Sequence, residues 1–176
     1  YVGGYDTRKN VEFLLHAYAI TKQKTPCPPL VLAGRIPAAG THACCEVRKT
    51  MTDLHLKAGF EVIMPGFIAS EDMPGLYGAA ELLIYPSLYE GFGLPAMEAF
   101  GCECPVVSSD NTSLPEIVKD KEYRFNTQSP EKLIKILARA ASTALPMNPS
   151  FSQNEFSEKT ALSLLISRLQ IGLHLV

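Results

Sequence analysis

The segment between Glu90 and Glu98 contains residue types that suit a ligand-binding site. It places Gly91, Gly93 and Pro95 between two carboxylates. Glycines permit backbone angles that are closed to other residues and leave nearby amide groups unshielded, and proline suits the first turn of a helix, where its missing N–H costs nothing. The pattern predicts a tight loop that leads into a helix running through Glu98. Backbone N–H groups at a helix start bind anions, and a phosphate is the natural ligand.

Two carboxylates beside a phosphate site indicate a ligand that also carries neutral hydroxyl groups. An ionised carboxylate is a strong acceptor, and each charge-assisted hydrogen bond contributes about 1.5–3 kcal/mol. A nucleotide sugar has phosphates in the middle and hydroxyl-rich rings at both ends, so we expect Glu98 to bind one ring and Glu90 the other. Arg8 and Lys9, in a turn that looks exposed, would supply the positive charge. Each feature alone is more often packing geometry or a solvated charge, but their conjunction favours a site.

Short apolar runs alternate with helical patterns along nearly the whole chain. An apolar stripe with helical spacing begins at Val11 and predicts one helix. Ser129, which precedes Pro130 and Glu131, is the expected cap of another helix, and a last helix is expected from about Ser157. Parallel strands need crossover connections, so the alternation predicts an α/β domain with a doubly wound parallel sheet of about six strands. The expected strands are Tyr1–Gly4, Leu30–Ala33, Glu61–Met64, Leu82–Tyr85, Pro105–Ser108 and Tyr123–Phe125. Ligands of such folds bind beyond the carboxyl ends of the strands, which is where the candidate residues fall.

Length and composition limit the class of protein. The 176 residues include 47% hydrophobic and 19% charged residues with a formal net charge of −2, which is typical of a soluble globular domain and gives no overall attraction for nucleic acid. No uncharged stretch reaches the ~20 apolar residues of a membrane span, and no secretory leader opens the sequence. Five cysteines, an odd number, favour reduced thiols in a cytoplasmic protein, and a metal at His42, Cys44 and Cys45 is less favoured than a small polar loop. We expect one domain over 1–176, with a partner domain upstream of the strand-like run at Tyr1.

These residues resemble the C-terminal domain of the retaining glycosyltransferases of family 4, whose GT-B architecture consists of two facing Rossmann-like domains. The segment from Glu90 to Glu98 is similar to the E-x7-E motif of that family. Further similar segments are the opening run, two strand ends and a later signature: Tyr1–Asn10, Val31–Gly34, Pro65–Ile68, Pro105–Ser108 and Leu114–Glu116. The similarity runs from Tyr1 to about Leu169. It implies that this chain is the Rossmann-like, donor-binding half of a GT-B enzyme.

The resemblance implies a role for each candidate residue. Lys9, together with Arg8, would neutralise the donor diphosphate. Glu98 would hold the ribose hydroxyls, and Glu90 would hold the hydroxyls of the transferred sugar. The other donor-binding residues would contact sugar and phosphate or border the nucleobase: Gly91, Phe92, Gly93 and Leu94, then Gly34, Arg35 and Ile68. Members of the family typically need no metal or other cofactor, since cations and the helix dipole stabilise the departing diphosphate.

The implied activity is the transfer of a hexose from a nucleoside diphosphate sugar to a hydroxyl acceptor with retention of configuration. The opening run looks most like mannosyltransferase-type members, which favours GDP-mannose over a UDP-sugar. A glycan or lipid-linked acceptor would bind through the N-terminal domain, at the cytoplasmic face of the membrane. The chain departs from the family at Gly4, where many members carry an arginine, so either Arg8 substitutes or the phosphate is held less tightly. Two alternatives stay open, namely a nucleotide-sugar-binding module without catalysis and a flavodoxin-like regulatory domain.

Overall fold

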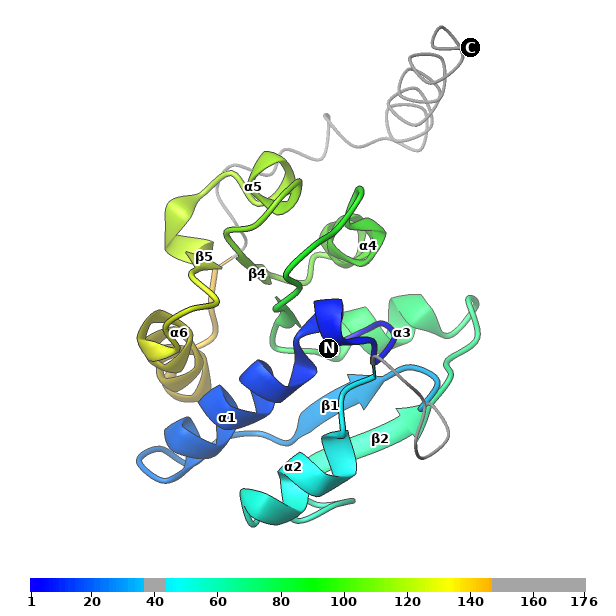
Figure 1. Cartoon of the computed structure of the whole chain (residues 1–176). Coiled ribbons are helices and arrows are strands. Elements are labelled where there is room, and N and C mark those ends of the chain that lie inside the picture. Colours follow the sequence, from blue (N-terminus) through cyan, green and yellow to red (C-terminus); the bar gives the residue numbers. More distant parts are fainter. Residues whose placement is uncertain (37–43, 147–176) are drawn as a thin grey trace, which may run out of the picture.

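The computed structural model describes residues 1–36 and 44–146, in which helices and strands alternate along the chain (Figure 1). The last helix expected from Ser157, and His42, lie outside the described residues. The helices are η1 (Thr7–Lys9), α1 (Val11–Lys22), α2 (Val47–Asp53), α3 (Met73–Gly78), α4 (Leu94–Gly101), α5 (Leu114–Ile117), η2 (Lys121–Tyr123) and α6 (Glu131–Ser142). The strands are β1 (Leu30–Ala33), β2 (Val62–Gly66), β3 (Leu83–Tyr85), β4 (Val106–Ser109) and β5 (Arg124–Phe125).

The strands are all parallel, as predicted, but they form two sheets rather than one sheet of about six strands. In one sheet β1 pairs with β2, and in the other the order is β3-β4-β5. The expected strand at Tyr1–Gly4 is only a bridge between Val2 and Ala33. The opening segment pairs with β1 at Val2 alone and then turns away into η1, so it forms no ladder. A hydrogen bond from Leu88 N to Arg8 O (2.7 Å) connects the loop after β3 to η1.

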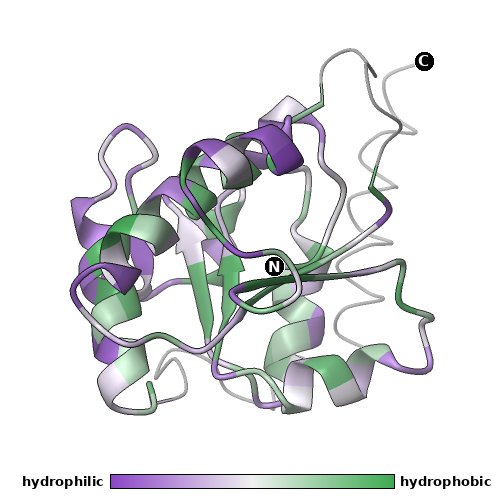
Figure 2. Ribbon diagram, turned by 90° about the horizontal axis from the view of Figure 1, so that it is seen from below, coloured by the Kyte–Doolittle hydropathy of each residue, from purple (hydrophilic) through white to green (hydrophobic). Residues whose placement is uncertain are grey.

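Burial of apolar faces explains where the helices form. The predicted stripe of α1 is confirmed, because Val11, Leu14 and Leu15 are fully buried. Helix α1 lies against α2 and α6, and α3 lies against α4. Figure 2 shows largely hydrophobic strands, with hydrophilic residues on the outer sides of several helices. The predicted cap of α6 is wrong: Pro130 occupies the cap position, and the Ser129 hydroxyl donates instead to the Glu131 carboxylate.

The five cysteines are free thiols, and they differ in burial. Cys45 and Cys104 are buried, whereas Cys27, Cys44 and Cys102 are partly exposed. Burial raises the pKa of the Cys104 thiol to about 11. The thiolate is the reactive form, so Cys104 combines low access with low thiolate content at neutral pH.

We therefore expect iodoacetamide at pH 8 to modify Cys102 at least about tenfold faster than Cys104, although the two are separated by one residue. With a pKa of about 11, the Cys104 thiol stays mostly protonated at pH 9, so its labelling should still be slower than that of Cys102 there, although its thiolate fraction rises about tenfold from pH 8. Peptide mass spectrometry of timed samples measures both rates in one experiment. Equal labelling of the two cysteines in the folded protein would contradict the burial of Cys104.

Candidate active site

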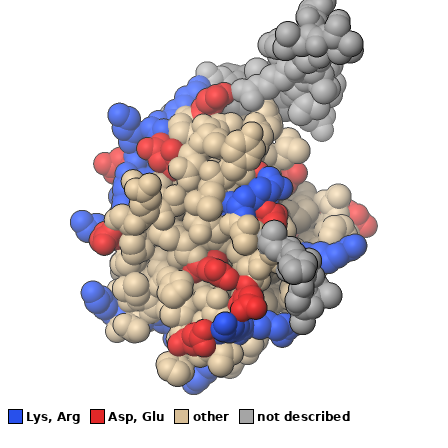
Figure 3. All heavy atoms as spheres, in the orientation of Figure 1, with Lys and Arg blue, Asp and Glu red and all other residues tan. Residues whose placement is uncertain are grey.

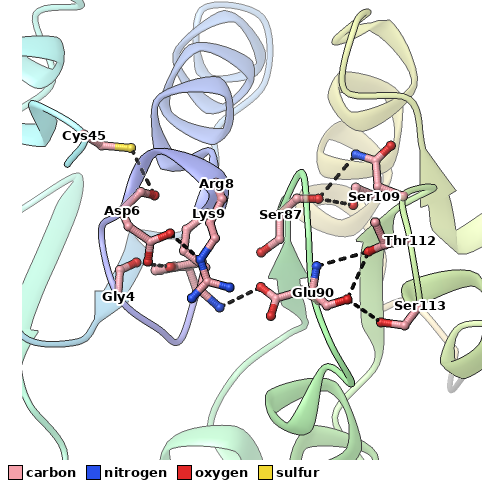
Figure 4. A network of polar contacts seen from close by, with 12 residues as sticks. Gly4, Asp6, Arg8, Lys9, Cys45, Ser87, Glu90, Ser109, Thr112 and Ser113 are labelled. Atoms are coloured by element: carbon pink, nitrogen blue, oxygen red, sulfur yellow. Dashed lines mark hydrogen bonds and ion pairs between the residues drawn. The ribbon is translucent and has the colours of Figure 1, made fainter. Parts of the chain in front are cut away.

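Three loops meet at the carboxyl edge of the strands. They are the segment 5–10 after the opening bridge, the segment 86–93 after β3 and the segment 110–113 after β4. The Asn10 side-chain amide donates to Pro86 O (3.3 Å), and the Asn111 side-chain amide donates to Ser87 O (3.3 Å). Since these bonds join residues far apart in sequence, the three loops form one structural unit (Figure 4).

Lys9 and Glu90 form a buried ion pair at the centre of this unit. The Lys9 Nζ lies 2.6 Å from Glu90 Oε1, and the two residues are only 9% and 8% exposed. The Lys9 ammonium also lies 5.5 Å from the centre of the Tyr85 ring. Burial, followed by the charge of Glu90, raises the pKa of Tyr85. The expectation that Lys9 is exposed in a turn is therefore wrong, because the loop after β3 folds over it.

Arg8 behaves differently from its neighbour. Its Nε lies 2.7 Å from Asp6 Oδ1, and its side chain is 53% exposed, as expected for a turn. The two cations are thus each paired with a carboxylate, one at the surface and one in the interior. Elsewhere on this face positive and negative side chains are mixed (Figure 3), so the charge distribution shown there has no broad basic region for nucleic acid.

The glycine-rich loop leads into α4 as the sequence predicts. Gly93 has a φ of 81°, the left-handed region, and occupies the cap position, while Pro95 lies in the first turn. A Cβ at Gly93 would also lie 3.0 Å from the Leu114 side chain. Glycine is therefore required here both by the backbone angle and by the close packing of α5. Gly91 and Phe92 precede this cap, and Leu94 is the first residue of α4, whose amide is one of those left without a partner inside the helix.

Glu98 faces α3 rather than the Lys9–Glu90 pair. The Tyr77 hydroxyl donates to Glu98 Oε2 over 2.8 Å, and Tyr77 itself is 2% exposed. Burial and this hydrogen bond to a carboxylate raise the pKa of Tyr77. Tyr77 is a residue that sequence reasoning missed, because it lies 21 positions upstream on another helix and carries no local motif.

The three residues expected to border a nucleobase follow two paired strands, Gly34 and Arg35 after β1 and Ile68 after β2. Gly34 N donates to Gly66 O, at the end of β2, over 2.8 Å. The Arg35 guanidinium lies 5.9 Å from the centre of the Phe67 ring, which is 69% exposed. The structure thus brings the candidates Lys9 and Glu90 together, with Arg8 next to Lys9 in the chain, whereas Glu98 contacts Tyr77 of α3.

A cavity of about 390 Å³ lies elsewhere, near the amino ends of the strands. Its walls are mainly apolar and include Tyr1, Leu30 and Leu83, and none of the predicted donor-binding residues lines it. Within residues 1–36 and 44–146 there is no group of three or more histidine, cysteine, aspartate or glutamate side chains able to hold a metal ion. Over the same ranges no helix is long and apolar enough to cross a membrane.

Comparison with known proteins gives consistent matches. The family model for glycosyl transferases group 1 matches residues 1–159. O-antigen chain mannosyltransferase B of Escherichia coli is 40% identical over 121 residues, which is 68% of this chain and 30% of that protein. The serotype-specific mannosyltransferase WbdA of E. coli is 29% identical over 136 residues, which is 77% of this chain and 16% of that protein. The chain thus spans less than a third of the length of these relatives.

Solved structures share the fold. The C-terminal domain of the group 1 glycosyl transferase LpcC of Francisella tularensis superposes with a TM-score of 0.65 at 28% identity, over 78% of this chain and 71% of that one. Anabaena HepE in complex with UDP and glucose gives a TM-score of 0.73 at 21% identity, over 96% of this chain and 47% of that one. Taken with the family match, these likenesses show that the chain belongs to the group 1 glycosyl transferases, family 4, as the C-terminal half of their GT-B architecture.

Proposed function

We propose that this chain is the donor-binding half of a retaining glycosyltransferase that moves a hexose from a nucleoside diphosphate sugar to a hydroxyl acceptor. The observation that carries the proposal is the buried Lys9–Glu90 pair beside the glycine loop of α4. A buried cation, a carboxylate and a helix start in one compact unit support this proposal, because they suit a diphosphate and the hydroxyls of a sugar.

The proposed mechanism begins with stabilisation of the leaving group. When the donor binds, its diphosphate replaces Glu90 as the ion-pair partner of Lys9. Arg8 and the N-terminus of α4 add positive potential around the diphosphate. Glu90, released from Lys9, accepts hydrogen bonds from the hydroxyls of the transferred sugar and orients it. The bond between the sugar and the diphosphate breaks, and the acceptor oxygen bonds to the same face of the sugar, so the configuration is retained. The proton of the acceptor hydroxyl passes to the departing diphosphate. Glu98 anchors the donor through the ribose hydroxyls.

The proposal extends to the donor, the acceptor and the other half of the GT-B architecture. Several relatives are mannosyltransferases, which supports GDP-mannose over a UDP-sugar as the donor. A glycan or lipid-linked acceptor would bind in an N-terminal domain upstream of residue 1, on the cytoplasmic side. The role that a metal has in other transferases would be taken by Lys9, Arg8 and the N-terminus of α4, so we expect no metal requirement. Because the acceptor would bind in the other domain, we expect no activity of this half alone.

The test is a thermal-shift titration with GDP, UDP and ADP without added metal, comparing the wild type with Glu98→Ala. A nucleotide at ~100 times its Kd adds about 2.7 kcal/mol of stability, which moves the melting midpoint by a few degrees. Glu98→Ala should raise the Kd about tenfold or more, because it removes charge-assisted bonds to ribose hydroxyls. Glu46→Ala is a suitable control, since Glu46 forms an exposed pair with Lys49 and is none of the proposed donor-binding residues.

The outcomes separate the possible functions. A shift with GDP alone, lost in Glu98→Ala and kept in Glu46→Ala, supports a GDP-sugar donor. A shift with UDP alone supports the same function with another donor. If no nucleotide shifts the melting of the full-length protein, the proposed function is wrong. If the nucleotide binds but the full-length protein transfers no sugar to any hydroxyl acceptor, the domain is a binding module without catalysis.

A further inference from the structure

Two hydroxyl groups from the loop after β4 hold the backbone of Glu90. The Glu90 N–H donates to Thr112 Oγ1 over 3.1 Å, and the Thr112 hydroxyl donates back to Glu90 O over 3.3 Å. The Ser113 hydroxyl donates to the same carbonyl over 3.0 Å. Figure 4 shows the two side chains on the side of Glu90 that is opposite Lys9. Both peptide groups of Glu90 are thus satisfied by side chains of another loop.

This arrangement bears on the carboxylate because Glu90 is almost buried. A buried N–H or C=O without a partner is strongly unfavourable, so the hydroxyls remove alternative positions for this part of the loop. With the backbone held from one side, the side chain extends to the other, where its Oε1 lies 2.6 Å from Lys9 Nζ. Three side-chain hydrogen bonds therefore hold the backbone of Glu90, while its carboxylate accepts from Lys9 and from the Tyr85 hydroxyl.

The backbone of Thr112 adds an independent observation. Its φ is 47°, in the left-handed region, which a β-branched residue rarely adopts. Glycine would adopt this conformation without strain but has no hydroxyl. Strained residues persist where the surroundings hold them, and they gather at functional sites. A threonine at this position is consistent with a requirement for its hydroxyl at Glu90.

We propose that Thr112 and Ser113 are positioning residues for Glu90. Their hydroxyls fix the peptide groups of Glu90, and through them the carboxylate that is to orient the transferred sugar. This inference rests on the proposed function, since it assigns the hydroxyl pair to the same site. It adds two residues to that site which contact neither donor nor acceptor and act only through Glu90.

The test uses the full-length protein with Thr112→Val, which keeps the β-branched shape and removes the hydroxyl. We expect kcat to fall by about 10- to 100-fold, because a small displacement of the group that orients the sugar lowers the rate of the chemical step. The KM for the sugar donor and the Kd for the nucleoside diphosphate should change less than about threefold. Thr112→Ser restores the hydroxyl and should recover most of kcat. Ser113→Ala, which leaves Thr112 on the same carbonyl, should have a smaller effect.

Hydrogen exchange provides a readout that does not depend on turnover. The amide of Glu90 should exchange at least about tenfold faster in Thr112→Val than in the wild type or Thr112→Ser, because its acceptor is gone. Thr21→Val is the matched control: the buried Thr21 hydroxyl donates to Ala17 O over 2.8 Å within α1, away from the site. That variant should change neither kcat nor the exchange of Glu90.

The possible results distinguish a failure of this inference from a failure of the proposed function. Unchanged kcat in Thr112→Val with an active wild type overturns this inference and leaves the proposed function standing. A raised KM with unchanged kcat also overturns it, since that result indicates direct contact with the donor. Unchanged exchange at Glu90 overturns the assigned hydrogen bond. A full-length wild type that transfers no sugar overturns the proposed function and this inference with it.

Discussion

Replacing Lys9 by methionine should lower the turnover of the full-length enzyme by about 10²- to 10³-fold, the usual cost of losing one charged donor at a developing oxyanion. The variant also leaves the Glu90 carboxylate buried without its partner, which lies 2.6 Å away in the wild type. Breaking one side of a buried pair costs about 3–5 kcal/mol of folding stability. Turnover should therefore be measured below the melting midpoint of the variant, with steady-state kinetics over a range of donor concentrations.

Two further variants separate the chemical role of Lys9 from its structural role. In the double variant Lys9→Met/Glu90→Gln no unpaired charge is left, so stability should recover in large part while turnover stays low. Lys22→Met is the matched control, because Lys22 lies 2.6 Å from Glu61 in a pair outside the site. Its turnover should equal that of the wild type. If Lys9→Met keeps turnover within about threefold of the wild type, Lys9 does not stabilise the leaving group.

Gly34→Ala should lower the free energy of unfolding by about 3–5 kcal/mol, among the largest effects of a single methyl group. A Cβ at Gly34 would lie 1.8 Å from Gly3 O. The backbone cannot easily yield, because Gly3 N donates to Ala33 O and Gly34 N donates to Gly66 O. Urea denaturation followed by circular dichroism measures the loss, and nucleotide binding should weaken in parallel under the proposal that the β1 loop borders the donor.

Gly75→Ala provides the control for the substitution itself. Gly75 lies within α3, where a Cβ would meet nothing within 4 Å. Alanine has the higher helix propensity, so this variant should be as stable as the wild type or up to about 1 kcal/mol more stable. A Gly34→Ala protein that unfolds at the same urea concentration as Gly75→Ala would show that the segment 1–4 does not lie against the β1 loop.

Part of the fold and of the site could be predicted because it depends on local sequence. The apolar spacing from Val11 predicts α1, and the glycines and Pro95 predict the loop that enters α4; both are confirmed. The alternation of strands and helices predicts parallel pairing, which follows from the length of the connections. The number of strands was overestimated, because whether Tyr1–Gly4 forms a ladder depends on its neighbours and not on its own residues.

The sequence by itself therefore determined the order of the elements, the glycine loop and the edge of the sheet at which candidate residues gather. Only the tertiary structure decided how these residues pair. Lys9 and Glu90 are 81 positions apart, and Thr112 reaches Glu90 across 22 positions, so no local pattern records either contact. The burial of Lys9 was missed for the same reason: exposure depends on which distant loop folds over a side chain, and such contacts are formed by packing across the whole domain.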